Sequence, residues 1–177
     1  MFKKPVYSRW IVLLMMLLTF SVLVVGCSQI GEKASEKITE KAIESASGGE
    51  VKVDLNDNQV KVESADGSSS FKTGGDLTWP KSMPADVPQL SGAKISNVSE
   101  TSTAEGQTIM VWVEDIGNAE QITKYKSDLE SQGWAITTTT NTPEGTYIMA
   151  EKAGWSLTAT FNTENGNGVI AAAKVKI

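Results

Sequence analysis

Residues 155–161 read Trp-Ser-Leu-Thr-Ala-Thr-Phe, and this stretch decides the fold class. Apolar side chains alternate with Ser and Thr throughout it. Because successive side chains of a β-strand point to opposite faces of its sheet, the pattern predicts a strand with one apolar and one polar face. Antiparallel sheets commonly bury one face and expose the other, so we expect an antiparallel sheet here.

Comparable segments lie between this strand and residue 90, and beyond it to the C-terminus. They are rich in β-branched and aromatic residues and are separated by turns that contain Gly, Asn or Pro. The expected strands are residues 93–99, 108–114, 134–140, 146–151, 155–161 and 169–177. Their order, with one helix after the second strand, predicts an α+β fold. We expect an antiparallel sheet of five to six strands with one helix across a face, formed by residues 77–177.

The expected helix has recognisable ends. Asn118 is a favourable N-cap, and Gln121 stands where a capping box needs it. Gly133 follows the helical pattern at the position where helices commonly end on Gly. The apolar stripe that should face the sheet consists of Ile122, Tyr125 and Leu129.

Residues 50–76 predict a short β-meander ahead of this sheet. Val-Lys-Val occurs at 51–53 and again at 60–62, with an Asn-rich turn between them. A segment of this length cannot enclose a hydrophobic core. We expect it to pack on the N-terminal helix, on the sheet domain or on a partner.

Proline punctuates the start of the sheet domain, at positions 80, 84 and 88. Proline fixes its own backbone angle and lacks the N–H that a sheet ladder needs. We therefore expect residues 79–88 to form an extended linker that runs along the sheet domain and enters it.

The N-terminal residues 1–26 have the features of a secretory signal peptide. Three basic residues precede an apolar run from Trp10 to Val25. This run is shorter than the about 20 apolar residues that a membrane-spanning helix needs. An uncleaved N-terminal anchor is the alternative interpretation.

The end of the apolar run, Leu23-Val24-Val25-Gly26-Cys27, resembles the lipobox of bacterial lipoproteins. This resemblance implies cleavage between Gly26 and Cys27 and a thioether-linked diacylglycerol, with its palmitate-type chains, on Cys27. The chain has no other Cys. We therefore expect a protein that is lipid-anchored to the cell membrane on its extracytoplasmic side, with an incidental free Cys as the alternative.

Residues 27–49 are expected to form a helical tether after the lipidated Cys. Glu recurs every four residues from Glu32 to Glu44, and small or aliphatic residues follow the same period. The stripe lacks Trp, Phe and Leu, which argues against a helix that lies in the membrane surface.

Three longer motifs resemble a group of uncharacterised bacterial lipoproteins, mostly from Gram-positive species. The motifs are the Glu/Lys-rich helix that runs into Gly48-Gly49, the segment from Trp79-Pro80 to Gly92-Ala93, and Tyr125-x₃-Leu129-x₃-Gly133-Trp134. The resemblance covers most of residues 30–177. It implies a small α+β C-terminal domain and supplies no catalytic residues.

The composition of the 177-residue chain restricts its chemistry. It has no His and one Cys, which excludes a Ser-His-Asp triad, a His-based metal site and an intrachain disulfide. Loss of residues 1–26 would remove three basic groups and no acidic one, which changes the net charge from −5 to −8. An acidic protein does not attract nucleic acid. We expect no catalytic residue, no metal and no cofactor.

One strand is apolar on both sides. Met110 and Trp112 alternate with Ile109, Val111 and Val113, and a single helix covers only one face of a sheet. The second face is expected either to be covered by the meander or the proline segment, or to be an exposed binding patch around Met110 and Trp112. We therefore expect a non-enzymatic binding or accessory module for a protein or envelope ligand. The alternative function is a carboxylate-dependent cell-envelope hydrolase.

Overall fold

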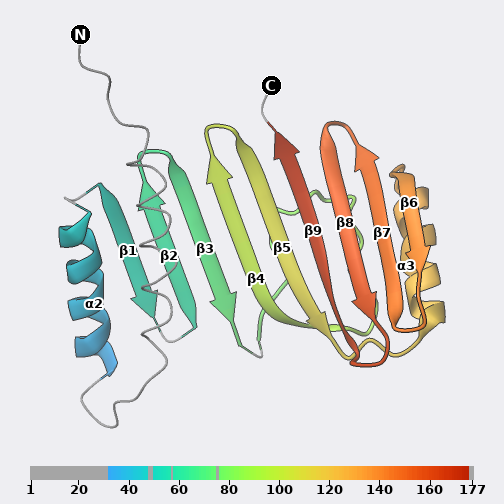
Figure 1. The fold of residues 1–177 in the computed structure, drawn as a ribbon, viewed down its shortest axis with the longest axis horizontal. Helices are drawn as coiled ribbons and strands as arrows, with labels where there is room; N and C mark the ends of the chain where they lie inside the picture. Colours follow the sequence, from blue (N-terminus) through green and yellow to red (C-terminus); the bar gives the residue numbers. More distant parts are fainter. Residues whose placement is uncertain (1–31, 48–49, 57, 75, 176–177) are drawn as a thin grey trace. The chain divides into compact units, whose positions relative to one another are not determined.

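The computed structural model describes residues 32–47, 50–56, 58–74 and 76–175 (Figure 1). The chain divides into two units, residues 1–35 and 36–177. Of the first unit the structure describes only Glu32 to Ser35, which begin helix α2. The signal peptide and the lipidation site predicted at Gly26 and Cys27 lie outside the described residues.

One antiparallel sheet of nine strands dominates the second unit. Its strand order is β1-β2-β3-β4-β5-β9-β8-β7-β6, so that β1 and β6 form its edges. The strands are β1 Val51–Asn56, β2 Gln59–Ser64, β3 Gly67–Thr73, β4 Lys94–Thr103, β5 Gly106–Glu114, β6 Ala135–Asn141, β7 Gly145–Lys152, β8 Trp155–Asn162 and β9 Asn167–Val175. The helices of the described residues are α2 Glu32–Ala46 and α3 Ala119–Ser131.

The prediction of an α+β fold, with a sheet of five to six strands and one helix across a face, is wrong. The described residues form mostly one open antiparallel sheet of nine strands, with two short helices beside it. The meander β1–β3 continues the same sheet, because β3 pairs with β4 over seven residues from Gly67↔Thr103 to Thr73↔Asn97. This pairing has a physical cause. An isolated meander would leave the backbone N–H and C=O groups of β3 unpaired at an edge. Strand β4 would have unpaired backbone groups on its outer side in the same way, so the two strands pair with each other.

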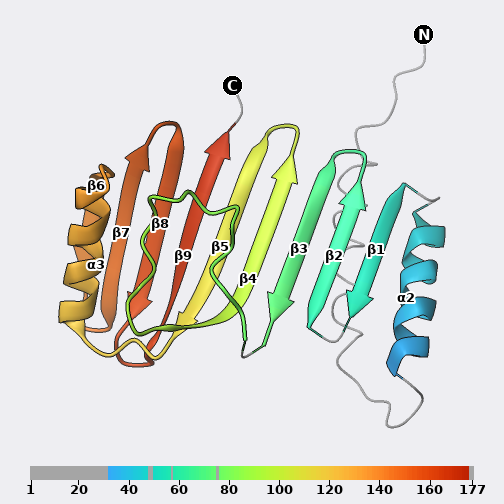
Figure 2. The same ribbon diagram turned by 180° about the vertical axis from the view of Figure 1, so that it is seen from behind.

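The hydrophobic core lies on one side of the sheet, which we call the core face. It is defined by Ile109, Val111 and Val113 of β5, all at most 2% exposed. Two segments cover this face, helix α3 near β7 and the coil of residues 77–93 (Figure 2). We call this coil the strap. It places Met83, Val87 and Leu90 in the core, which confirms that the proline segment enters the sheet domain.

Helix α3 forms as the sequence predicts. The Asn118 side chain accepts a hydrogen bond from the Gln121 N–H at 3.0 Å, and Gly133 adopts φ +83° after the last turn. Ile122, Tyr125 and Leu129 are buried against the sheet. The Gln121 side chain accepts from the Gly117 N–H, one residue before the N-cap. The helix therefore begins and ends where its own side chains satisfy the backbone.

The strap is fixed to the sheet by polar contacts as well as by burial. The indole N–H of Trp134 donates to the backbone oxygen of Asp86 at 3.0 Å. Lys152 pairs with the carboxylate of Asp86. The strap has no strand partner, and short turns satisfy its backbone groups instead. In one of them the N–H of Met83 donates to the backbone oxygen of Pro80 at 3.1 Å.

Helix α2 caps the outer edge of β1. The N–H of Leu55 donates to the Glu40 carboxylate at 2.6 Å, and the N–H of Val53 donates to the Glu44 carboxylate at 3.3 Å. The N–H of Val51 donates to the hydroxyl of Ser47. Glu40 and Glu44 are four residues apart, which is a rise of about 6 Å along a helix. Outward N–H groups of a strand recur every two residues, which is about 6.8 Å, so the spacing of the carboxylates matches the spacing of the N–H groups that they accept from.

Candidate binding face and its cavity

Alternate side chains of strand β5 point to the two opposite faces of the sheet. Its odd residues Ile109, Val111 and Val113 are buried under α3 and the strap, whereas Met110 and Trp112 are half-buried on the other side. We call this other side the Trp112 face. Figure 1 looks onto it. Neither the meander nor the strap lies over it: the meander extends the sheet sideways, and the strap covers the core face.

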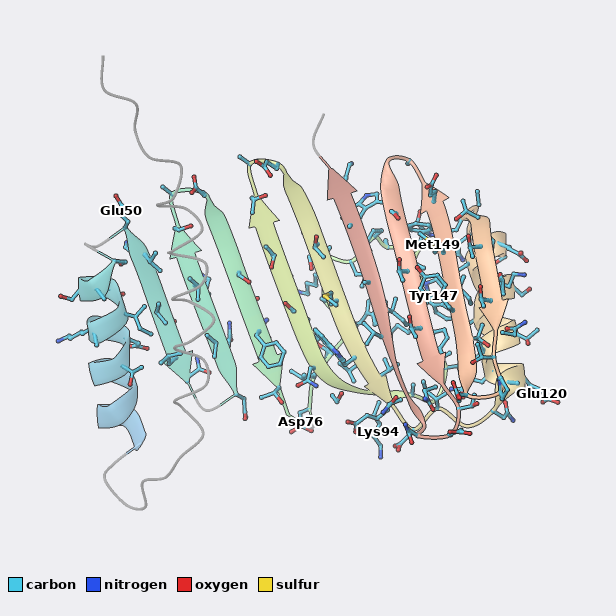
Figure 3. All side chains as sticks on the ribbon, viewed as in Figure 1. Glu50, Asp76, Lys94, Glu120, Tyr147 and Met149 are labelled. Carbon is cyan, nitrogen blue, oxygen red and sulfur yellow. The ribbon has the colours of Figure 1, made fainter. Side chains whose placement is uncertain are left out.

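The strand register sets which side chains share the Trp112 face. Trp112 is aligned with Asn97 on β4 and Val169 on β9. The same row continues to Thr160 on β8 and Tyr147 on β7. A neighbouring row contains Phe71, Ser99, Met110, Ala171, Thr158 and Met149. Figure 3 labels Tyr147 and Met149 on β7.

Few charges are present on this face. From β5 to β7 its described charged side chains are Glu114 and Glu151, one at each end of the strands. By contrast, the opposite side of strands β1–β3 carries the charged side chains Lys52, Lys61 and Glu63. Apart from Glu114 and Glu151, the Trp112 face from β5 to β7 is therefore a surface of apolar, aromatic, amide and hydroxyl side chains, on a protein that is acidic as a whole.

An aromatic pair stands at the middle of this face. Phe71 on β3 is 41% exposed, and its ring contacts the Trp112 indole edge-on with centroids 6.1 Å apart. Such edge-to-face contacts hold both rings in fixed orientations. The indole of Trp112 therefore contacts Phe71 on its β3 side and remains partly exposed.

A cavity of about 320 Å³ adjoins Trp112 at the end of the strands. Amide and hydroxyl side chains, which both donate and accept hydrogen bonds, line it together with the indole and the Glu114 carboxylate, which only accepts. Its lining includes Asn97, Trp112, Glu114, Thr160, Asn162 and Asn167. A β-bulge between Ile95 and Asn97 shifts the register of β4 at this point, which places Ser96 at the cavity as well.

A second cavity of about 490 Å³ shares Glu114 and Asn167 with the first and is also lined by Asp115 and Glu164. All three carboxylates are exposed, and Asp115 is paired with Lys94 at 2.7 Å. A carboxyl that acts as a general acid near neutral pH is normally shielded from water. These carboxylates have no such shielding.

The structure places both predicted patch residues, Met110 and Trp112, on the Trp112 face. The sequence pattern gives no sign that Asn97, Asn162 and Asn167 belong to the site, because Asn at the end of a strand usually indicates a turn. Asn162 does have that role, since its side-chain oxygen accepts from the Asn165 N–H at 2.9 Å. Only the pairing of β8 with β9, with Asn162 opposite Asn167, shows that the amides converge beside Trp112.

Within the described part of the chain, no group of three or more His, Cys, Asp or Glu side chains is placed to hold a metal ion. No described helix is both long and apolar enough to cross a membrane. No protein-family model, curated protein or solved structure matches this chain. Function is therefore inferred from the chemistry of the site itself.

Proposed function

We propose that this protein is a lipoprotein, anchored through Cys27 to the extracytoplasmic side of the cell membrane, and that it acts there as a non-enzymatic binding or accessory module through its Trp112 face. The observation that carries the binding role is the sparsely charged Trp112 face itself. A half-buried Trp, an exposed Phe and a half-buried Met stand on it without a covering segment among the described residues.

The anchor is supported by the sequence alone. A basic start, an apolar run of signal-peptide length and a lipobox-like ending at Gly26-Cys27 follow one another in the order that bacterial lipoproteins show. Acyl chains contribute about 0.8 kcal/mol per buried CH₂, so two or more chains hold a protein at a membrane stably.

The binding role is supported by the contrast between the two faces. Apolar side chains on the core face are buried by α3 and the strap, whereas Met110, Trp112 and Phe71 on the Trp112 face remain partly exposed. An apolar surface rimmed by polar residues is a common feature of interaction sites. Trp is also enriched among residues that dominate binding energy.

Replacement of Cys27 tests the anchor. In cells that express Cys27→Ala, the protein should be released from the membrane fraction without detergent, because the acyl chains have no attachment point. Ser28→Ala is the matched control and should remain in the membrane fraction. Unchanged, detergent-dependent retention of Cys27→Ala would disprove the lipid anchor.

Crosslinking in intact cells tests the binding face. A photo-reactive amino acid at Met110 should form a discrete adduct with an envelope component, since Met110 lies on the Trp112 face. The same residue at Glu130, which is exposed on α3, is the control and should not form that adduct. If the two positions give the same products, the Trp112 face has no specific ligand and the proposed binding role fails.

A further inference from the structure

The cavity beside Trp112 combines one aromatic surface with several amide and hydroxyl groups. Trp112 is half-buried, so part of its indole faces the cavity, while Phe71 supports it from the β3 side. Asn97, Asn162 and Asn167 each bring a carbonyl oxygen and an NH₂ group, and Thr160 brings a hydroxyl. These groups come from four strands, β4, β5, β8 and β9, so a rigid sheet sets their spacing.

The lining matches the chemistry of a sugar ring. A pyranose has C–H groups on its flat sides and hydroxyls on its rim. The C–H groups carry a small positive charge and the face of an aromatic ring is negative, so the two surfaces attract each other. Each sugar hydroxyl both donates and accepts, as do the amides of Asn. An indole flanked by amides therefore suits a sugar better than a wholly apolar ligand.

Charge selects among sugars. The cavity is lined by one charged side chain, Glu114, and it is negative. The nearest cation in the register, Lys94, is already paired with Asp115 at 2.7 Å. A phosphate or a uronic acid would find no free positive partner among these residues and would meet the Glu114 carboxylate. These charges therefore favour a neutral sugar over an anionic one.

The size of the cavity and the row beyond it indicate a chain of sugars. A volume of about 320 Å³ is at the lower end of small-molecule pockets, large enough for one ring. Tyr147 stands in the same row as Trp112, three strands away, which is about 14 Å at the strand spacing of a sheet. Val169 and Thr160 lie between the two aromatic residues and present no charge.

We propose that the Trp112 face binds a neutral glycan chain, with one sugar ring in the cavity between Trp112 and the amides of Asn97, Asn162 and Asn167, and with the chain continuing across β9 and β8 toward Tyr147. This inference rests on the proposed binding function and adds the chemical class of the ligand.

Titration of the full chain in detergent with two neutral tetrasaccharides tests the inference. The probes are tetra-N-acetylchitotetraose and cellotetraose, both flat β-linked chains, and calorimetry and Trp fluorescence are the readouts. At least one probe should bind, and Trp112→Ala should weaken it at least about tenfold, as expected for an aromatic anchor. Asn167→Ala should weaken binding several-fold without a folding defect, because its side chain is exposed and lies at the cavity.

Matched controls separate the site from general effects. Trp155→Phe changes another half-buried Trp, on the core-face side of β8, and should leave the affinity unchanged. Asn141→Ala changes an exposed amide at the end of β6, away from the cavity, and should also have no effect. Asn162 is not used, because its side chain stabilises the turn after β8.

The outcomes distinguish this inference from the proposed function. If neither tetrasaccharide binds while the Met110 position still crosslinks a specific envelope component, the glycan inference is wrong and the binding role stands. If a probe binds equally well to wild type, Trp112→Ala and Asn167→Ala, the sugar site lies elsewhere and the inference is also wrong. If neither experiment gives a specific partner, both fail.

Discussion

Phe71 on β3 and Trp112 on β5 form an edge-to-face aromatic pair, with ring centroids 6.1 Å apart and planes at 75°. The two residues are 41 positions apart in the chain and are separated by strand β4 in the sheet. The contact joins strand β3 of the meander to strand β5. It also keeps the indole of Trp112 upright on a face that the described segments leave open.

Trp112 should contribute modestly to stability. We expect Trp112→Ala to lower the free energy of unfolding by about 1–2 kcal/mol, because the side chain is half-buried and loses mainly its contact with Phe71. Trp134→Ala is the comparison. Trp134 is 3% exposed and hydrogen-bonded to Asp86, and its removal should cost about 3–5 kcal/mol. Equal losses in chemical unfolding would make Trp112 a core residue and contradict the binding face.

The buried hydroxyl of Tyr125 should reduce stability. Tyr125 is 1% exposed and its ring packs edge-on against Phe161, but its hydroxyl has no hydrogen-bond partner. An unsatisfied buried polar group costs about 1–3 kcal/mol. Tyr125→Phe should therefore raise the free energy of unfolding by about 1 kcal/mol, measured in urea. A loss of stability would show that the hydroxyl makes a favourable contact.

The same residue should make the protein sensitive to alkali. Burial raises the pKa of Tyr125 above its ordinary value of 10.0. Above pH 10 the unfolded chain loses this proton while the folded chain keeps it, so stability falls as pH rises, by about 1.4 kcal/mol per pH unit from this group. The difference between pH 9 and pH 11 should be smaller in Tyr125→Phe.

The backbone of Ala153, in the turn between β7 and β8, is strained, and a substitution should relieve this strain. Ala153 has φ +48° and Gly154 has φ +79°, so both residues of this two-residue turn are left-handed. Asn tolerates this conformation better than Ala, and Asn-Gly is the preferred pair for such a turn. Ala153→Asn should stabilise the protein by about 0.5–1 kcal/mol. Ala104→Asn, in another exposed turn, is the control; an equal gain there would refute strain relief at Ala153.

The carboxylates of α2 should protect the edge of β1. Removal of the acceptors in Glu40→Ala with Glu44→Ala should speed amide exchange at Val53 and Leu55 about fivefold or more, since each bond contributes roughly 1 kcal/mol. Glu40→Gln with Glu44→Gln retains an acceptor oxygen and should restore most protection. Lys37→Ala with Lys41→Ala, at exposed positions, is the matched control. Unchanged exchange in the Ala variant would contradict capping by α2.

The local structure of this protein follows from short stretches of its sequence. The alternation in residues 155–161 produced strand β8 with Leu157, Ala159 and Phe161 buried, and Asn118 and Gly133 bounded helix α3. These features depend on backbone geometry and on which side chains avoid water, and both are encoded within a few neighbouring residues.

The way in which these elements combine depends on contacts between residues far apart in the chain. The number of strands depended on whether β3 finds a partner, and its partner β4 begins 21 residues after β3 ends, beyond the strap. The choice of covered face depended on where the strap returns, which an extended proline-rich segment does not specify locally. The amides beside Trp112 converge for the same reason: β4, β5, β8 and β9 meet through hydrogen bonds between residues far apart in the chain, and no local pattern encodes such a meeting.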